Sequence, residues 1–274
     1  MKVAYLGPSG SFTHNVALKA FPQAELLAFE TITEVLKAYQ DKLVSYAIVP
    51  VENSIEGSVH ETTDYLFHQS DIKAVVEIIQ PIKQQLMTAG DKKPEKIFSH
   101  PQAIAQGKKY IGDHYPEVKL ETTGSTASAA RFVAEHPDQP FAAIAPEAAA
   151  TEYGLTIIAK DIQEIEENFT RFWVLGASVP TIQLPSLSEK MSLALTLPDN
   201  LPGALYKGLS VFAWRGIDLT KIESRPLKTM LGEYFFMVDV ANQDRELVGY
   251  ALAELKSLGI RYKVLGEYIV HTMA

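Results

Sequence analysis

The chain has 274 residues, of which 47% are apolar and 21% charged, and its net charge is −8. This is the composition of a globular protein with material for about two domains. The acidic balance argues against a nucleic-acid or anionic-membrane surface, and the absence of cysteine excludes disulfides, thiolate catalysis and cysteine-based metal sites. We recognise no signal peptide or membrane-spanning run, so we expect a cytoplasmic protein without a membrane partner.

A glycine-rich turn follows the first predicted strand, residues 3–6, and leads into a predicted helix. Strand, glycine-rich turn and helix is the usual layout that directs backbone amides towards an anion. The third glycine of the dinucleotide-binding fingerprint is missing, and an ordinary strand–helix turn would give the same pattern. The stretch from Gly7 to His14 therefore leaves both interpretations open.

Polar residues gather after the third predicted strand. A strand at 26–29 precedes a helix that opens with a Thr31–Glu34 capping box, and the next strand, 46–51, is a continuous apolar run typical of burial on both faces. Ligands collect beyond the carboxyl ends of such strands. The alternative is a polar connection in which Ser54 caps the helix predicted at 62–67. The candidate site residues here are Asn53, Ser54 and Glu56.

An apolar stretch at 74–88, interrupted by Pro81, can carry the chain from one lobe into a second. Beyond it a short strand at 97–98 precedes Ser99-His100-Pro101-Gln102, and a proline in the first turn marks a helix start. His100 and Gln102 would then lie at a helix N-terminus. His100 fits a proton donor and a capping or surface histidine equally well.

A hydroxyl-rich turn follows the strand predicted at 118–120. Ser125 or Thr126 is a natural N-cap for the next helix, whose small residues allow close packing. Two hydroxyls and free amides at this end suit an anion, and plain helix capping explains them just as well.

The chain then alternates a strand at 141–145, a helix at 146–152 and a strand at 155–159 before it reaches the strand 168–176. Repeated alternation of strands and helices predicts parallel sheets flanked by helices. The number of strands fits two small lobes with a cleft better than one sheet.

The strand that begins at Asn168 carries Thr170 and Arg171 between large aromatic residues, one of which is Phe172. Arginine presents a planar fork of donors that suits a carboxylate, and threonine presents one steerable donor. Partly removed from water, both groups would interact more strongly. The alternative is a strand with an ordinary surface threonine and arginine.

Proline and serine recur between 178 and 190, which predicts an interdomain linker. The remainder has the element order βαββαβ, a ferredoxin-like pattern. Its predicted strands are 191–197, 219–224, 233–240 and 262–270. Its predicted helices are 202–214, capped by Asp199 or Asn200, and 246–258.

In this order the motifs closely resemble the prephenate dehydratase family, in its bacterial monofunctional type with a C-terminal ACT regulatory domain. The resemblance covers essentially the whole chain and rests on 7–12, 49–57, 99–103, 125–127, 170–172, 203–205 and 223–226. It implies an α/β protein with a two-lobed, periplasmic-binding-protein-like catalytic domain over residues 1–180. A ferredoxin-like ACT domain would follow over 190–274.

The resemblance implies a carbon–oxygen lyase that converts prephenate to phenylpyruvate, with loss of water and carbon dioxide, in L-phenylalanine biosynthesis. No cofactor or metal is expected. Thr170 matches the catalytic residue of the family, and we expect its hydroxyl to stabilise the departing hydroxyl by a hydrogen bond rather than by full proton transfer. We expect Arg171 to pair with a substrate carboxylate. The other candidate catalytic residues are Phe172, Asn53, Ser54, Glu56, His100, Gln102, Ser125 and Thr126.

The C-terminal part resembles a sensor through which L-phenylalanine, the end product of the pathway, inhibits the enzyme. Regulatory domains of this kind pair side by side, which predicts a homodimer or homotetramer. The residues that the resemblance assigns to the sensor are Asn200, Leu201, Gly203, Ala204, Leu205, Glu223, Ser224, Arg225 and Pro226.

The sequence leaves two other functions open. Dehydration of arogenate, which carries an amino acid in place of the keto acid, would use the same chemistry, and the sequence does not separate the two substrates. A two-lobed protein that binds a small anion without catalysis would use Arg171 but not the adjacent Thr170.

Overall fold

The computed structural model describes residues 1–197, 202–228 and 233–273. The chain forms two compact units, and it passes from one to the other four times. The first unit consists of residues 1–60, 79–172 and Met273, and the second of residues 61–78 and 173–272. Strands β5 (Ala74–Pro81) and β11 (Phe169–Gly176) therefore each contribute to both units.

The first lobe of the first unit is built on a parallel core. Strand β1 lies between β2 and β3 and pairs with both of them in parallel, and β5 and β11 extend the sheet beyond β3. Helix α2 opens with the predicted capping box, because the side chains of Thr31 and Glu34 each bond the other's backbone amide. The elements are β1 (Lys2–Leu6), α1 (Phe12–Ala20), β2 (Glu25–Phe29), α2 (Ile32–Gln40) and β3 (Tyr46–Asn53).

A short hairpin ends β3 and was not predicted from the sequence. Strand β4 (Gly57–Ser58) pairs antiparallel with Glu52 and Asn53, and Gly57 takes the left-handed φ of 84° that the tight turn requires. The alternative in which Ser54 caps the following helix is wrong, because α3 (His60–His68) begins only after the hairpin.

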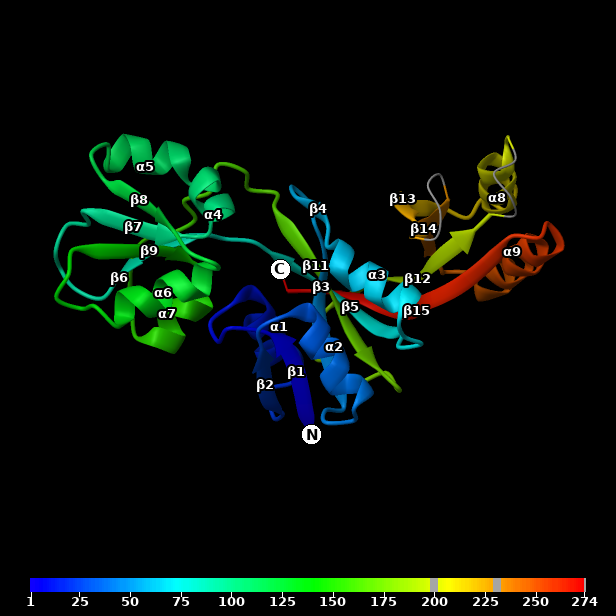
Figure 1. Cartoon of the computed structure of the whole chain (residues 1–274), viewed down its shortest axis with the longest axis horizontal. Helices are drawn as coiled ribbons and strands as arrows, with labels where there is room; N and C mark the ends of the chain where they lie inside the picture. Colours follow the sequence, from blue (N-terminus) through cyan, green and yellow to red (C-terminus); the bar gives the residue numbers. More distant parts are fainter. Residues whose placement is uncertain (198–201, 229–232, 274) are drawn as a thin grey trace. The chain divides into compact units, whose positions relative to one another are not determined.

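The second lobe of the first unit is a five-stranded sheet with the order β10-β6-β9-β7-β8. Strands β6 to β9 are labelled in Figure 1. Strand β7 is parallel to β8 and β9, whereas β6 is antiparallel to β9 and β10. The sheet is therefore mixed, although the alternation of elements predicted a parallel one. Its strands are β6 (Gln85–Thr88), β7 (Lys96–Ser99), β8 (Lys119–Thr122), β9 (Phe141–Ala145) and β10 (Thr156–Ala159).

Helices cover both faces of this five-stranded sheet, with α6 and α7 on one face and α4 and α5 on the other (Figure 1). Along β9, Ala143 and Ala145 contact the first pair, and Ala142 and Ile144 contact the second pair. Successive residues of a strand point to opposite faces, so burial on both sides explains the continuous apolar run of β9. The helices are α4 (Pro101–Gln106), α5 (Lys108–His114), α6 (Thr126–Ala134) and α7 (Glu147–Tyr153).

Two segments, 82–84 and 160–168, connect the two lobes, and hydrogen bonds hold them side by side. The backbone amide of Gln84 donates to the Gln163 side chain at 2.8 Å, and the amide of Ile162 donates to the Gln84 carbonyl at 2.9 Å. The amide of Ile82 donates to the carbonyl of Asn168 at 2.8 Å. The structure confirms an α/β fold with two sheets.

The second unit contains an antiparallel sheet with the order β13-β14-β12-β15, and its elements follow the predicted order βαββαβ. Helices α8 and α9 pack on one face, over a core that includes Leu193, Phe212 and Val238. The elements are β12 (Ser186–Thr196), α8 (Ala204–Ala213), β13 (Leu219–Pro226), β14 (Tyr234–Ala241), α9 (Arg245–Ser257) and β15 (Arg261–Thr272).

Helix α3 packs on the opposite face of this antiparallel sheet. The ring of Phe67 on α3 stacks on Phe235 with the ring centroids 3.9 Å apart. The ammonium of Lys263 donates to the carbonyl of Phe67 at 3.1 Å, near the end of α3. Residues 61–78 therefore supply a layer of the second unit, far in sequence from its other elements.

The stretch 178–190 is a linker only in its first part, because β12 already begins at Ser186 and pairs with β15 from that residue. Ladder pairing uses backbone groups, so the serines and charged residues at 186–190 gave no apolar signal of a strand. The helix cap predicted at Asp199 or Asn200 lies outside the described residues. Helix α8 follows Gly203, whose φ is 80°.

Candidate active site

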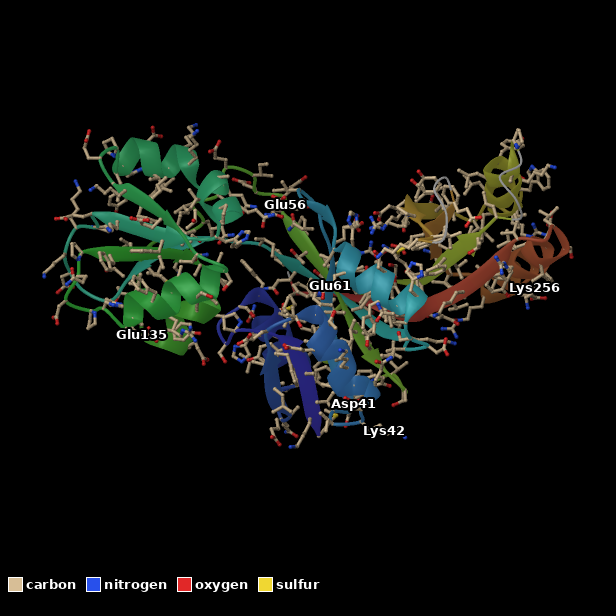
Figure 2. All side chains as sticks on the ribbon, viewed as in Figure 1. Asp41, Lys42, Glu56, Glu61, Glu135 and Lys256 are labelled. Carbon is tan, nitrogen blue, oxygen red and sulfur yellow. The ribbon has the colours of Figure 1, made fainter. Side chains whose placement is uncertain are left out.

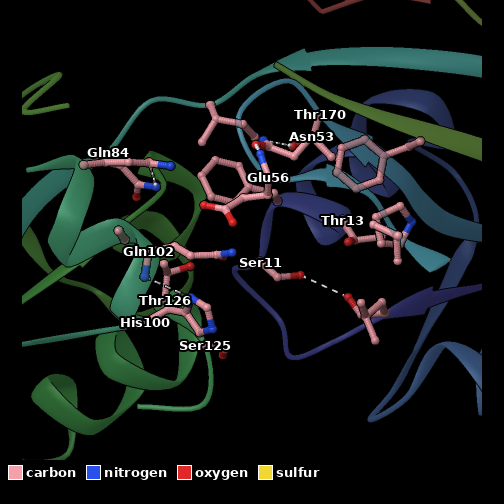
Figure 3. Close-up of a pocket in the computed structure, with 18 of the residues that line it drawn as sticks. Ser11, Thr13, Asn53, Glu56, Gln84, His100, Gln102, Ser125, Thr126 and Thr170 are labelled. Carbon is pink, nitrogen blue, oxygen red and sulfur yellow. Dashed lines mark hydrogen bonds between the residues drawn. The ribbon is translucent and has the colours of Figure 1, made fainter. Parts of the chain in front are cut away.

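A cavity of about 550 Å³ lies in the first unit between its two lobes (Figure 3). It brings together the hairpin after β3, the N-terminus of α4, the N-terminus of α6 and the start of β11. These segments are far apart in the sequence, and each was predicted to carry site residues. The candidate catalytic residues that line the cavity are Asn53, Glu56, His100, Gln102, Ser125, Thr126, Thr170 and Phe172.

Thr170 reaches the cavity from β11, where Thr170 and Phe172 lie on the same face of the strand. The Nδ2 amide of Asn53 donates to Oγ1 of Thr170 at 2.9 Å (Figure 3). Because the threonine oxygen accepts this bond, its own hydroxyl hydrogen can be donated to a ligand in the cavity. Asn53 therefore sets the direction in which Thr170 donates.

The side chain of Asn53 is itself fixed from both ends. Its Oδ1 accepts from the backbone amides of Ile55 at 3.0 Å and Glu56 at 3.1 Å, which closes the turn of the hairpin. Its Nδ2 also donates to Oδ1 of the buried Asn168 at 2.9 Å. Asn53 thus connects the hairpin to β11 and leaves little freedom for the Thr170 hydroxyl.

Glu56 is the only charged residue among those that line the cavity, all of which belong to the described part of the chain. Its side chain projects from the β3–β4 hairpin (Figure 2). No lysine or arginine of the described residues contributes to the lining. Attraction for an anion must therefore come from hydroxyls, side-chain amides, backbone amides and the imidazole of His100.

Three helices begin at the cavity. Ser11 caps α1, His100 caps α4 and Ser125 caps α6, and each side chain accepts a backbone amide of the first turn, at 3.2, 3.4 and 3.0 Å. The N-terminus of a helix carries partial positive charge and free amide donors. Together, these three helix ends make the cavity favourable for an anion without a lysine or arginine in the lining.

The turn between β1 and α1 requires glycine at position 10. Gly10 has a φ of 76°, and an added Cβ would lie 3.0 Å from Ala149 and 3.1 Å from Tyr153. Its amide donates to Nδ1 of His14 at 2.9 Å. Burial lowers the pKa of His14, against the opposing charge of Glu152, and this favours the neutral ring that can accept the bond.

Two candidate catalytic residues lie outside the cavity lining. Arg171 belongs to the other face of β11, and its Nη1 lies 2.6 Å from Oε2 of Glu52, with 14% and 26% of the two side chains exposed. Ser54 pairs the hairpin with β11, because its Oγ accepts the amide of Phe169 at 3.0 Å. The structure thus gives both residues protein partners and does not bring Arg171 to the cavity.

Five polar residues of the cavity wall were not predicted from the sequence: Ser11, Thr13, Ser58, Gln84 and Gln106. Gln106 lies one helical turn after Gln102, and this spacing places both on one face of α4. Gln84 belongs to the polar break Lys83-Gln84-Gln85 in an otherwise apolar stretch, and this break was a usable signal for buried polar groups. The turn at 7–14 was recognised as an anion-binding pattern, but its residues were not assigned to the site.

The residues assigned to an L-phenylalanine sensor do not share one face of the second unit. Gly203, Ala204 and Leu205 form the start of α8, whereas Asn200 and Leu201 lie outside the described residues. Along β13, Ser224 and Pro226 are exposed and alternate with Glu223 and Arg225, which are partly buried. Consecutive residues of a strand cannot all contact one ligand.

Arg225 forms a bidentate ion pair with Asp64 of α3, through hydrogen bonds of 2.9 to 3.3 Å. Each side chain is 15% exposed. Lys228 also reaches Asp64, at 2.8 Å. Burial alone would raise the pKa of Asp64, but hydrogen bonds from Lys228 and Arg225, together with their charges, hold it below its ordinary value.

The described residues include neither a metal-binding cluster nor a membrane-spanning helix. Within residues 1–197, 202–228 and 233–273, no three His, Asp or Glu side chains gather in a group able to hold a metal ion. Over the same ranges, no helix has the length and apolar character to cross a membrane.

The fold and the cavity define a two-lobed α/β enzyme for a small-molecule substrate. A family model described as prephenate dehydratase matches residues 3–179. A prephenate dehydratase of Lactococcus lactis subsp. lactis is 50% identical over 100% of this chain and 99% of its own length. A prephenate dehydratase of Bacillus subtilis is 41% identical over 98% of both chains.

Among solved structures, a prephenate dehydratase of Arthrobacter aurescens in complex with L-Phe superposes with a TM-score of 0.85. It is 30% identical, over 98% of this chain and 89% of its own. The chain belongs to the prephenate dehydratase family. It is an enzyme, a carbon–oxygen lyase, and the full-length matches fit the monofunctional type.

Proposed function

We propose that the protein converts prephenate to phenylpyruvate, carbon dioxide and water in the biosynthesis of L-phenylalanine. The observation that carries the proposal is the hydrogen bond from Asn53 to Thr170 at 2.9 Å inside the cavity. The fixed direction lets the threonine hydroxyl donate to one particular atom of a ligand in the cavity, as stabilisation of a departing oxygen requires. Family membership supports the reaction, and the geometry supports the roles that we assign to the residues.

In the reaction the bond between the ring carbon and the hydroxyl oxygen breaks, and the oxygen takes one proton and leaves as water. The electron pair of the bond to the ring carboxylate moves into the ring, and carbon dioxide departs. Thr170 donates a hydrogen bond to the departing oxygen, where negative charge develops. One such donor is typically worth about 100- to 1,000-fold in rate.

The two carboxylates of prephenate suit a cavity onto which three helix N-termini open. Ser125 and Thr126 at the start of α6 can hold one carboxylate, and His100 and Gln102 at the start of α4 can hold the other. Phe172 is buried at the cavity wall and excludes water beside the ring. Glu56 orients the substrate or the proton network from the hairpin.

Arg171 acts through its ion pair with Glu52 rather than through the substrate. The pair joins β11 to β3 next to the two residues of those strands that reach the cavity, Thr170 and Asn53. Ser54 supports the same junction through its bond to Phe169. We therefore assign Arg171 and Ser54 to the positioning of Thr170.

The test is to mix the purified chain with prephenate and to follow phenylpyruvate as it forms. Turnover well above the spontaneous rate is the expected result. Arogenate in a parallel reaction separates the two dehydratase substrates, and faster conversion of arogenate would replace prephenate in this proposal. Tight binding of prephenate without turnover would reduce the chain to a binding protein.

We further propose that residues 1–180 form the catalytic domain, of the kind found in two-lobed bacterial binding proteins, and that residues 190–274 form an ACT regulatory domain. The match of the family model ends at residue 179, and the remaining elements have the βαββαβ order. The Arthrobacter relative was solved in complex with L-Phe. We extend that ligand to this chain as an inhibitor.

Gly203, Ala204 and Leu205 at the start of α8 provide backbone donors for the amino acid's carboxylate. Gly203→Ala tests this site: an added Cβ meets no atom within 4 Å, but the φ of 80° strains any other residue. We expect the variant to lose inhibition by L-phenylalanine and to keep its basal rate. Coupling of about 1–3 kcal/mol should make inhibition graded and reciprocal, so an unreactive prephenate analogue should weaken phenylalanine binding.

The regulatory parts of two chains would pair to give a homodimer or homotetramer. Strand β13 is at the end of the strand order, and Ile222, Tyr206 and Trp214 of the second unit are exposed apolar side chains. An unprotected edge strand is a template for pairing. Sedimentation at micromolar concentration should show the assembly, and a monomer would contradict it. The cytoplasmic location expected from the sequence stays a prediction.

A further inference from the structure

Gln84 places a buried carbonyl at the wall of the cavity. The residue is 3% exposed, and its Oε1 has no hydrogen-bond partner among the described residues. Gln84 also lines the cavity, as Figure 3 shows. Buried polar atoms without partners are rare in native proteins, and each one calls for an explanation such as a ligand.

The carbonyl is held in place rather than left mobile. The backbone amide of Gln84 donates to Oε1 of Gln163 at 2.8 Å, and its backbone carbonyl accepts from Ile162 at 2.9 Å. Its Nε2 donates to Oε1 of Gln106 at 3.3 Å. One amide hydrogen is directed to Gln106, and the side-chain oxygen remains as an acceptor without a partner in a residue that lines the cavity.

The neighbouring Gln85 shows what a satisfied buried glutamine looks like in the same segment. Its Nε2 donates to the Asp161 carboxylate at 3.1 Å, and its Oε1 accepts the Asp161 amide at 3.0 Å. Gln85 is 4% exposed and does not line the cavity. Gln80 is also 4% exposed and also has an Oε1 without a partner, but it does not line the cavity, so what distinguishes Gln84 is its place in the cavity wall.

A fixed acceptor selects a donor on the ligand. Prephenate at neutral pH has two carboxylates and a ketone, which only accept hydrogen bonds, and its ring hydroxyl is its single donor. We infer that Gln84 accepts a hydrogen bond from the ring hydroxyl of the substrate, an inference that rests on the proposed dehydration of prephenate. Gln84 thereby recognises the ring hydroxyl, which is the group that leaves as water.

This bond would contribute to binding and to the orientation of the ring hydroxyl. Negative charge develops on the departing oxygen, so its O–H group does not become a better donor during the reaction. The Gln84 carbonyl therefore acts on the bound substrate rather than on the transition state. Thr170 donates to the oxygen, and Gln84 accepts from its hydrogen.

The test compares Gln84→Leu with the wild type on two ligands, prephenate and its 4-deoxy analogue, in which hydrogen replaces the ring hydroxyl. Loss of one hydrogen bond with a ligand group should lower kcat/KM for prephenate about 10- to 100-fold. The inhibition constant of the deoxy analogue should stay within about twofold of the wild-type value, because that ligand never made the bond.

Two further variants keep the result interpretable. Gln84→Glu retains an acceptor oxygen, and we expect it to keep more of the preference for the hydroxyl than Gln84→Leu does. Gln85→Leu is the matched control: it removes an equally buried glutamine beside the first, and should lower Tm without changing the ratio between the two ligands. If Gln84→Leu does not fold, Gln84→Met takes its place.

The outcomes separate this inference from the proposed function. If the wild type does not convert prephenate, the proposed function fails. If the wild type is active and Gln84→Leu weakens prephenate and the deoxy analogue by the same factor, Gln84 is structural and the inference is wrong. A loss confined to arogenate would assign the carbonyl to an ammonium group and would also overturn it.

Discussion

The predicted site residues are arranged differently at the cavity of the first unit and along strand β13 of the second unit. At the cavity, residues from four distant segments converge, and most of those predicted from the sequence are among them. On β13, four consecutive predicted residues divide between two faces, and Arg225 turns to Asp64. The cavity residues come together because strand ends and helix starts meet there. The β13 residues are separated because successive residues of a strand point to opposite faces.

The same rule explains Arg171. Thr170, Arg171 and Phe172 are consecutive on β11, so the arginine must lie on the face opposite its two neighbours. A motif of three residues on a strand can place only its first and third members in one site. Arg171, predicted to meet a substrate carboxylate, and Arg225, assigned to the L-phenylalanine sensor, are both found paired with a carboxylate of the protein, Glu52 or Asp64.

The largest effect is expected at the cavity side of the comparison, from Thr170→Ala. Loss of the donor to the departing oxygen should lower kcat about 100- to 1,000-fold and change KM little. Steady-state kinetics with prephenate measures both constants. Thr170→Ser should keep much of the rate, and Thr156→Ala, an exposed threonine on β10 outside this cavity, should keep all of it. A kcat for Thr170→Ala within twofold of wild type would exclude the role.

Asn53→Asp should give the next largest effect. An aspartate cannot donate to Oγ1 of Thr170 and would instead accept the threonine hydrogen, which turns the hydroxyl away from the substrate. We expect kcat to fall about 10- to 100-fold, as for the loss of one catalytic hydrogen bond. The double variant with Thr170→Ala should be no slower than Thr170→Ala alone. Independent, multiplying losses would show that Asn53 acts elsewhere.

The ion pair on the opposite face of β11 can be tested with a double-mutant cycle. We expect Arg171→Lys and Glu52→Gln each to lower kcat/KM about tenfold, and the double variant to lose little more, because the two residues act as one unit. Kinetics of the four proteins gives the coupling. If Arg171 instead binds a substrate carboxylate, Arg171→Lys will raise KM while Glu52→Gln leaves it unchanged, and the effects will add.

The smallest effect on activity is expected from the ion pair of Asp64 and Arg225 in the second unit. Asp64→Asn removes a carboxylate that two cations hold, and for a partly buried pair this should cost about 1–2 kcal/mol of unfolding free energy at pH 7. The basal rate should change little. Chemical denaturation at pH 7 measures the loss, and Asp71→Asn on a fully exposed side chain is the control.

The pH dependence of that loss has a definite sign. The folded pKa of Asp64 lies below the ordinary value of 3.8, so its contribution is complete above that value and disappears as pH falls below it, through the folded pKa. The stability difference between wild type and Asp64→Asn should therefore shrink in acid. A difference that is constant from pH 7 to pH 3 would exclude the ion pair as its source.

The sequence predicted most of the fold because its strands and helices carry clear local signals. The capping box at Thr31, the buried apolar run of β3 and the order of the C-terminal elements all appear as predicted. The hairpin at β4 was missed because two residues leave no periodicity to recognise. The start of β12 was missed because its pairing depends on β15, about eighty residues away along the chain.

Within the site, the sequence indicated residue types better than it indicated partners. Asn53, His100 and Ser125 were found from their positions at strand ends and helix starts, where geometry follows from local pattern. The partners of Arg171 and Arg225 are carboxylates more than a hundred residues earlier in the chain. Tertiary packing determines which residues form such long-range pairs, and no local sequence pattern predicts them.

The repeated passage of the chain between the two units limits what a protease can separate. A single cut in the exposed stretch around Val179 would leave α3, β5 and β11 on the N-terminal fragment and β12 to β15 on the C-terminal fragment. The stacked rings of Phe67 and Phe235 and the pair of Asp64 and Arg225 would still join them. We expect a nicked protein that elutes as one species and comes apart only in denaturant.

Expression of residues 1–180 alone would have the opposite outcome. Without β14 the ring of Phe67 has lost its stacking partner, and β5 has lost its neighbour β15, so an apolar face and an open sheet edge meet water together. Such a fragment would aggregate before it could report an unregulated rate. An enzyme that L-phenylalanine no longer inhibits is therefore better sought among full-length point variants than among shortened chains.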